Sequence, residues 1–452
     1  MNTKKVFALA MVLALSLGIL AGCGSSGVSQ TSGAASAPDG QTSQSPASQT
    51  EPSQKPAEPV TIKWVLWDWD LTTYYKALIE AYTAVNPHVT IEYVDLGGAD
   101  FMPMLSTQLS GGADFDVLAI KDIPGYANLI RQKHLEPLNN YIAEKNIDTS
   151  LYGGTVEQLT VDGNIYQLPF RSDFWIIYYN KDLFDKAGIA YPTNDMTIEQ
   201  YDELSRKLTS GSGASKIYGA HYHTWRSAVT LFGILDGKHT VVDGNYDFLK
   251  PYYERILKLQ NDGIVQDYAT LRTSSTHYSG VFFNNQVAMM NMGTWFIATQ
   301  IDKIKSGESL STNWGIVKYP HPEGVEAGTT LGTITGIAVN AKSAKKDAAL
   351  DFLRFMTGPE GAAVIAKTGT IPAIKNEEVI NAISSMEGFP ADVNSKEALY
   401  TYKTYLEMPL HDKGSDIEVA LNEGHENIMT KNVTIDQGIS DLNKRIAEII
   451  GN

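Results

Sequence analysis

The order of apolar runs over residues 60–120 constrains the fold of this 452-residue chain more than any other feature. Val60–Trp67 is β-branched and apolar, as buried strands are, and Val89–Val94 and Asp116–Ile120 repeat that pattern. Between them, Thr72–Val85 and Phe101–Leu109 place apolar residues three and four positions apart, the spacing of a helix face. This β-α-β-α-β order predicts a parallel sheet that is covered by helices.

Later segments continue to alternate between expected strands and expected helices, and no internal repeat is evident. Trp175–Tyr179, Gln286–Met292 and Leu331–Asn340 are expected strands, whereas Thr197–Leu208 and Ala344–Met356 are expected helices, the first capped by Thr197. The sequence therefore predicts an α/β fold of two lobes joined by more than one crossing of the chain. Ligands of such sheets bind beyond the carboxyl ends of the strands, which directs attention to the loops at residues 67–70 and 121–122.

The composition excludes several classes of protein. The chain has 51 Asp and Glu against 36 Lys and Arg, a formal net charge of -15, which argues against binding to nucleic acid or to anionic lipid. A hydrophobic fraction of 43% indicates a globular protein. The single cysteine excludes an intrachain disulfide framework and a tetrahedral cysteine zinc site.

The N-terminal residues have the layout of a secretion signal followed by a tether. Two lysines precede the apolar run Val6–Leu20, and residues 1–22 are expected to be a signal peptide. The run ends in Leu-Ala-Gly-Cys23, which resembles a bacterial lipobox and predicts lipidation at Cys23; an ordinary signal with a stray cysteine is the alternative. Residues 23–59, with nine Ser and five Pro among the last 36, are expected to form a disordered linker.

Seven motifs, in order, resemble the extracellular solute-binding proteins of family 1, the sugar-binding components of ABC importers, which include the maltose-binding-protein-like lipoproteins. Each motif is weak by itself, and together they span residues 86–373. They are Asn86–Ile91, Gly111–Val117, His134–Leu138, Asp162–Pro169, Tyr178–Phe184, Phe282–Trp295 and Gly369–Ala373.

The resemblance implies a periplasmic-binding-protein-like fold, with two hinge-connected lobes around a central ligand cleft. The N-terminal lobe is then residues 60–171 and 333–370, and the C-terminal lobe is residues 172–332 and 371–452. The implied protein is a monomer, lipid-anchored on the outer face of a Gram-positive-type cell membrane. It captures a mono- to oligosaccharide by cleft closure and delivers it to the permease subunits of an ABC transporter, without bond chemistry, cofactor or metal.

Candidate ligand contacts in the N-terminal lobe follow its strands. A pyranose has an apolar face that matches an aromatic ring and a rim of hydroxyls that matches carboxylates. Trp67, Asp68 and Trp69 end or follow the first strand, and Asp122 follows the third and matches a family acid that contacts sugar. Asp68 can instead cap a helix, and Asp122 can instead be a turn residue.

Two candidates lie at the first crossing and one at the second. Asp173 matches a family carboxylate that binds sugar. Arg171 is expected to bond a hydroxyl or a uronate carboxylate, or simply to pair with Asp173. Thr333 offers backbone groups to a ligand.

The remaining candidates lie in the C-terminal lobe. Tyr222, Trp225 and Arg226 share one short segment, in which Tyr222 matches a family stacking tyrosine. Trp295 follows an expected strand where the family places a tryptophan that stacks on sugar.

Three other functions remain open. A secreted glycoside hydrolase shares the aromatic residues and needs two carboxylates about 5–10 Å apart, which Asp68 and Asp122 can supply by chance. A metal receptor can use His221 and His223, which point the same way on an extended stretch. A binding protein for another solute, such as a uronate, polyol or peptide, is the third alternative.

Overall fold

The computed structural model describes residues 58–451. The expected signal peptide, Cys23 and nearly all of the expected linker lie outside these residues. Within residues 58–451, no helix combines the length and the apolar character that crossing a lipid bilayer requires.

Nine strands of residues 58–451 form one sheet, in the order β2-β1-β3-β8-β4-β6-β5, with β7 paired to β4 and β9 to β8. The expected β-α-β-α-β unit is confirmed, with β1 parallel to both β2 and β3. The strands are β1 (Val60–Leu66), β2 (Val89–Asp95), β3 (Val117–Ile120), β4 (Leu168–Asn180), β5 (Tyr218–His221), β6 (Val287–Gly293), β7 (Trp314–Lys318), β8 (Thr329–Val339) and β9 (Lys403–Leu406).

Helices pack around this sheet, and the expected ones at α1, α2, α7 and α13 are confirmed to within two residues at each end. Thr197 caps α7 in a capping box with Gln200. The helices are α1 (Thr73–Val85), α2 (Phe101–Ser110), α3 (Ile123–Arg131), α4 (Asn139–Lys145), α5 (Thr155–Gln158), α6 (Lys181–Ala187), α7 (Ile198–Leu208), α8 (Ser227–Thr230), α9 (Lys250–Asn261), α10 (Tyr268–Thr273), α11 (Tyr278–Phe283), α12 (Phe296–Lys305), α13 (Lys346–Thr357), α14 (Pro359–Ala366), α15 (Glu377–Ser384), α16 (Val393–Glu397), α17 (Gly414–Met429) and α18 (Ile435–Ile450).

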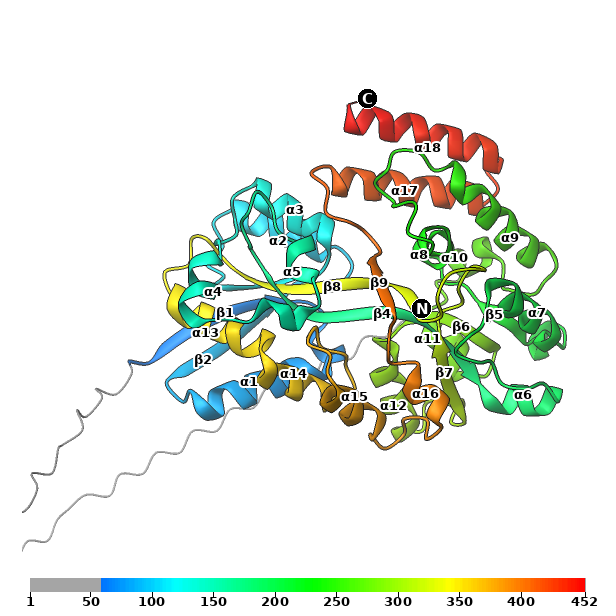
Figure 1. Cartoon of the computed structure of the whole chain (residues 1–452), viewed down its shortest axis with the longest axis horizontal. Coiled ribbons are helices and arrows are strands. Elements are labelled where there is room, and N and C mark those ends of the chain that lie inside the picture. Colours follow the sequence, from blue (N-terminus) through cyan, green and yellow to red (C-terminus); the bar gives the residue numbers. More distant parts are fainter. Residues whose placement is uncertain (1–57, 452) are drawn as a thin grey trace, which may run out of the picture. The chain divides into compact units, whose positions relative to one another are not determined.

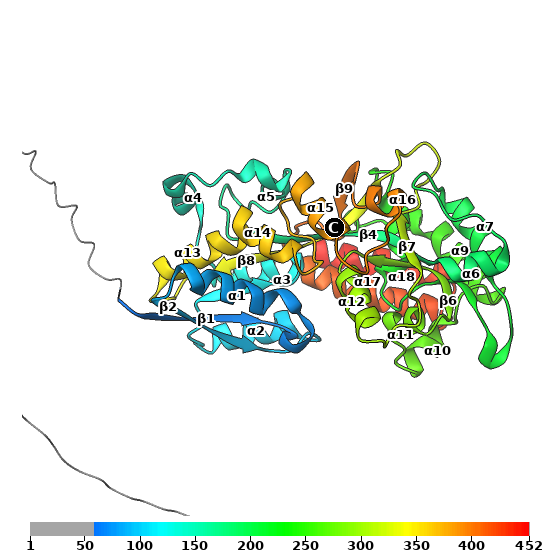
Figure 2. The same ribbon diagram turned by 90° about the horizontal axis from the view of Figure 1, so that it is seen from below.

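Separate hydrophobic cores divide this body into two lobes. One core combines β1–β3 and α1–α3 with the end of β8 and with α13, and we call this part the N-lobe. Two adjoining cores combine β5–β7 with α7, α9, α12, α17 and α18, and we call this part the C-lobe. In Figure 2, α1 and α2 gather around β1 and β2, whereas α6, α7 and α9 gather at the other end of β4.

Strands β4 and β8 pass from one lobe into the other as an antiparallel pair (Figure 1). The first half of β4 pairs with β8, and its second half pairs with β6 and β7. Accordingly, Phe170 belongs to the N-lobe core and Trp175 to a C-lobe core. The expected strand at Trp175–Tyr179 is therefore only the second half of a 13-residue strand that runs through the hinge.

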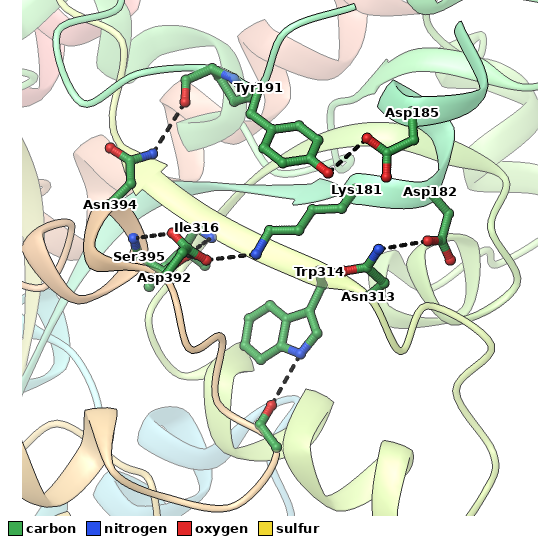
Figure 3. A network of polar contacts seen from close by, with 12 residues as sticks. Lys181, Asp182, Asp185, Tyr191, Asn313, Trp314, Ile316, Asp392, Asn394 and Ser395 are labelled. Atoms are coloured by element: carbon green, nitrogen blue, oxygen red, sulfur yellow. Dashed lines mark hydrogen bonds and ion pairs between the residues drawn. The ribbon is translucent and has the colours of Figure 1, made fainter. Parts of the chain in front are cut away.

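A polar network attaches the segment around α16 to the C-lobe (Figure 3). Lys181, at the start of α6, donates to Asp392 at 2.6 Å, and the Asp392 carboxylate also caps α16 by accepting from the Ser395 amide. The Ser395 hydroxyl in turn accepts from the Ile316 amide of β7. The chain that re-enters the C-lobe after its last crossing is thus held by hydrogen bonds as well as by its apolar residues.

Candidate ligand-binding cleft

A pocket of about 560 Å³ lies between the two lobes. The N-lobe contributes α2, the β3–α3 turn and the start of α3. Residues 332–334 of β8 also line the pocket, and the C-lobe contributes Arg226, the two residues after β9, and α17. This volume is within the range of small-molecule sites, roughly 300–1,000 Å³. Its lining residues are Met102, Pro103, Ser106, Lys121, Asp122, Ile123, Pro124, Gly125, Asn128, Arg226, Gly332, Thr333, Ile334, Glu407, Met408, Ser415, Glu418 and Val419.

The N-lobe wall places a carboxylate at the carboxyl end of β3. Asp122 is the N-cap of α3 and accepts a hydrogen bond from the Gly125 amide at 2.7 Å, yet its side chain stays exposed to the pocket. The neighbouring Lys121 ammonium donates to the Gly98 carbonyl and lies 5.7 Å from the centre of the Trp67 ring. Burial lowers the pKa of Lys121. Asp122, whose expected alternative role was that of a turn residue, therefore caps α3 and also has access to the cleft.

The C-lobe wall carries a bidentate ion pair and a second carboxylate. Arg226 is 3% exposed and donates to both oxygens of Glu418, at 3.2 and 2.5 Å. Its Nη1 atom has no hydrogen-bond partner among the described residues. Glu407 accepts from the Trp175 indole at 3.0 Å, and burial raises the pKa of Glu407. This wall offers a ligand carboxylate acceptors, and the unpartnered guanidinium nitrogen of Arg226 is buried behind them.

At the hinge, Arg171 and Asp173 form a buried ion pair on β4. The Asp173 carboxylate is 1% exposed and accepts from Arg171 at 2.8 Å and from the Thr294 hydroxyl at 2.9 Å. The second Nη of Arg171 donates to the Tyr74 hydroxyl of α1. This pair links the N-lobe helix α1, the hinge strand and the end of β6.

A group of aromatic rings lies beside the pocket in the C-lobe. The centre of the Trp225 ring lies 5.5 Å from that of Tyr278 and 6.2 Å from that of Trp295. Trp295 in turn packs edge-on against Trp175, with ring centres 5.7 Å apart. The Trp295 ring covers Gly293, where an added Cβ would come within 2.0 Å of the indole. Only glycine at that position leaves room for the ring, so the backbone of β6 fixes the place of Trp295.

The three candidates that follow β1, which are Trp67, Asp68 and Trp69, have different surroundings. Trp67 is buried against Phe101, and Trp69 stacks on the Tyr93 ring of β2 at 3.7 Å. Asp68 has a left-handed backbone with φ 52° and stands at the N-cap of a 3-10 turn, without a capping hydrogen bond from its side chain. None of the three lines the pocket.

The structure therefore brings together only part of the expected set. Asp122, Arg226 and Thr333 line the pocket, whereas Tyr222 is buried inside the C-lobe, where its hydroxyl accepts from Arg255 at 2.7 Å. The sequence reasoning missed Glu407 and Glu418. They lie beyond residue 373, where the resemblance carries no motif.

The described residues contain no group of three His, Cys, Asp or Glu side chains that could hold a metal ion. His221 and His223 are neighbours, with ring centres 6.0 Å apart. Burial lowers the pKa of His221 to about 3 and that of His223 to about 4, so both rings are neutral at neutral pH.

Comparison with known proteins identifies the family. Residues 68–363, which include parts of both lobes and the N-lobe wall of the cleft, match the family model for bacterial extracellular solute-binding protein. The chain belongs to this family. The fold agrees, because two lobes crossed by a strand pair around a central cleft are what family membership implies.

Among curated relatives of this solute-binding protein, the lactose-binding protein of Rhizobium radiobacter is 25% identical over 303 residues, which cover 64% of this chain and 68% of the relative. The sn-glycerol-3-phosphate-binding periplasmic protein of Pectobacterium atrosepticum is 26% identical over 267 residues, 55% of this chain and 58% of the relative. The relatives therefore include binders of chemically different solutes.

Solved structures support the same fold. A sugar transporter from Rhizobium etli, in an open conformation, has a TM-score of 0.77 and 58% identity, covering 85% of this chain and 98% of the other. A substrate-binding protein from Listeria monocytogenes in complex with cycloalternan has a TM-score of 0.75 at 20% identity, covering 87% of this chain and 100% of the other.

Proposed function

We propose that this solute-binding protein captures a carbohydrate in the cleft between its lobes. The observation that carries the proposal is the combination of carboxylates on both walls of one pocket, Asp122 facing Glu407 and Glu418, with tryptophan rings beside it. Carboxylates accept hydrogen bonds from sugar hydroxyls, and indole rings match the apolar face of a pyranose. The names of the lactose-binding relative and of the sugar transporter support the same solute class.

The charges of the pocket favour an uncharged ligand over a uronate or a phosphate ester. Arg226 is already paired with Glu418, and Lys121 is directed to the Gly98 carbonyl. At the hinge, Arg171 is paired with Asp173, which is one of the partners expected for it from the sequence. An anionic ligand would meet three carboxylates and would have to compete for cations that already have partners.

In this proposal, binding shifts the lobes toward a closed form. A ligand that touches Asp122 on one wall and Arg226 on the other gains both sets of contacts only when the cleft is closed. The hinge then bends where β4 and β8 cross, near the expected lobe boundaries at residues 171–172, 332–333 and 370–371. The closed form is the one that the ABC permease receives, and the protein performs no bond chemistry.

We also propose that Cys23 carries a lipid and that the linker holds a monomeric receptor on the outer face of the cell membrane. A thioether-linked diacylglycerol and an amide-linked chain supply the two apolar anchors that stable attachment needs. A Cys23→Ser variant should move from the membrane fraction to the medium, and its retention on the membrane would contradict the anchor.

A ligand panel tests the solute class. A bound ligand raises the melting temperature according to RT ln(1 + [L]/Kd), which is about 2.7 kcal/mol when the ligand is at 100 times Kd. The panel contains neutral mono- and oligosaccharides, glucuronate, polyols, sn-glycerol 3-phosphate and short peptides. Stabilisation by a neutral sugar supports the proposal, and stabilisation by another class alone contradicts it. Turnover of an oligosaccharide would instead favour a glycoside hydrolase.

A further inference from the structure

Apolar side chains line the pocket from both lobes, and no lining residue in the part of the chain that the structure describes is aromatic. Four of these apolar residues belong to α2 and α3, one belongs to β8, and two come from the C-lobe. We call this surface the apolar wall, defined as Met102, Pro103, Ile123, Pro124, Ile334, Met408 and Val419. A ligand in the pocket therefore contacts aliphatic and thioether groups as well as carboxylates.

Val419 gives the apolar wall an open position on α17. It is 50% exposed, and of the exposed large apolar side chains of residues 58–451 it alone lines the pocket. The other lining residues of α17, Ser415 and Glu418, are polar. Covering an exposed valine removes apolar surface from water, but the gain is realised only if the ligand presents an apolar group to it.

The two methionines bring adaptable apolar groups to opposite sides of the pocket. Met102 packs on Gly125 so closely that an added Cβ on this glycine would lie 2.4 Å from the methionine methyl carbon. Met408, in the C-lobe, has its methyl carbon 3.9 Å from the corresponding point on Gly414. An unbranched thioether side chain adapts its shape to the group it contacts. The wall can therefore follow the outline of an apolar substituent.

Most polar side chains of the lining already have partners within the protein. Ser106 donates to Gln132 at 2.8 Å, and Ser415 donates to the carbonyl of Pro124 at 3.0 Å. The amide oxygen of Asn128 accepts from a guanidinium of α3 at 2.7 Å. The carboxylates keep lone pairs for sugar hydroxyls, because a carboxylate can accept about four hydrogen bonds. A hydroxyl directed at the apolar wall would instead lose water without gaining a partner, which is unfavourable.

We propose that the carbohydrate carries an apolar substituent, a short alkyl or acyl group, and that this substituent lies on the apolar wall. The sugar hydroxyls bond the carboxylates, and the substituent contacts Met102 and Pro124 from the N-lobe and Met408 and Val419 from the C-lobe. Glycosides with an aliphatic aglycone and acylated sugars have this chemistry. This inference rests on the proposed carbohydrate function and specifies the class of carbohydrate.

Matched ligands that differ only in an alkyl group test the inference. The purified protein is titrated by calorimetry with glucose, galactose and mannose, and with the methyl and butyl glycosides of each. In at least one series the butyl glycoside should bind more tightly than the methyl glycoside, by about fourfold for each methylene that enters the pocket. Its binding should also have the more negative heat-capacity change, which marks burial of apolar surface.

Three variants locate the substituent. Val419→Thr replaces a methyl group by a hydroxyl in a side chain of similar shape, and Met408→Gln replaces a thioether by an amide. Each should lower the ratio of butyl to methyl affinity about two- to fourfold. Val393→Thr is the matched control, because Val393 is an exposed C-lobe valine outside the lining, and it should leave the ratio unchanged. Circular dichroism and melting temperatures confirm that each variant is folded.

The outcomes are distinguishable. Equal affinity for the butyl and methyl glycosides of every sugar that binds overturns the inference while carbohydrate binding stands. A butyl preference that neither Val419→Thr nor Met408→Gln lowers also overturns it, because the substituent then lies elsewhere. If 1-butanol alone binds as tightly as the butyl glycoside, or if the unaltered protein binds none of these compounds, the carbohydrate function falls together with the inference.

Discussion

Replacing Asp173 by Asn should destabilise the protein far more than the same replacement at an exposed ion pair. Asp173 is 1% exposed and pairs with the mostly buried Arg171. In Asp173→Asn, one amide atom can still accept from Thr294, but the other presents N–H groups to the Arg171 guanidinium. Removing one partner of a buried pair costs about 3–5 kcal/mol, because the remaining charge is left without compensation.

Asp114→Asn is the matched control. Asp114 pairs with Lys63 at a similar distance, 2.7 Å, but the two side chains are 76% and 31% exposed. Solvent screens such a pair, so its loss should cost below about 1 kcal/mol.

Urea unfolding, followed by circular dichroism, measures both variants. With an m-value above about 3 kcal/mol/M for a body of this size, Asp173→Asn should lower the midpoint by roughly 1 M and Asp114→Asn by about 0.3 M or less. The double variant Arg171→Met with Asp173→Asn should be less destabilised than the sum of its single changes. Equal midpoint shifts for the two Asp→Asn variants would refute the reasoning from burial.

Three further predictions follow from local geometry. Gly293→Ala should displace the Trp295 ring and weaken carbohydrate binding about tenfold or more in calorimetry, because the new Cβ would lie 2.0 Å from the indole; unchanged affinity would show that Trp295 is not fixed by this contact. Burial lowers the pKa of His425 to about 3, so the neutral ring contributes its full share of stability above pH 6.5 and loses about 2 kcal/mol of it by pH 5, at about 1.4 kcal/mol per pH unit. The melting temperature of His425→Asn should therefore fall less between pH 7 and pH 5 than that of the unaltered chain, and parallel falls would contradict this. Thr197→Ala should cost about 1 kcal/mol in urea unfolding through loss of the capping box, and no change in the midpoint would show that the cap is dispensable.

The sequence predicted well the strands whose apolar residues follow a regular pattern, because β1, β2 and β3 lie within one residue of their expected ends. β3 is a fully buried apolar run and β1 is largely apolar and half-buried or buried, whereas β2, at the edge of the sheet, alternates apolar with polar side chains and is mostly exposed or half-buried. β4 was predicted only in part, because Arg171 and Asp173 interrupt its apolar run. Their mutual pairing is what allows charged side chains inside a strand, and pairing in space is invisible in a linear pattern.

The candidate site was harder to predict, because it depends on which partner each side chain finds. Stacking of Trp69 on a ligand stays a prediction; in the structure its ring stacks on Tyr93, which the parallel pairing of β1 and β2 brings beside it. Tyr222 was matched to a family stacking tyrosine by its spacing from Trp225 in the sequence. In the structure its hydroxyl accepts a hydrogen bond from Arg255. Glu407 and Glu418 reach the pocket only because the chain returns to the C-lobe after its last crossing.

The strand pair that runs through both lobes determines how the molecule can move. Backbone hydrogen bonds make β4 and β8 a flexure, a strip that bends and twists readily but resists stretching. A flexure permits rotation of the lobes about itself and opposes their separation or sliding. Under the proposed function, opening and closing of the cleft would then be a rotation of the lobes about this strand pair. Substitutions in the cleft would therefore change how often the closed form is populated and leave the path between the two forms as it is.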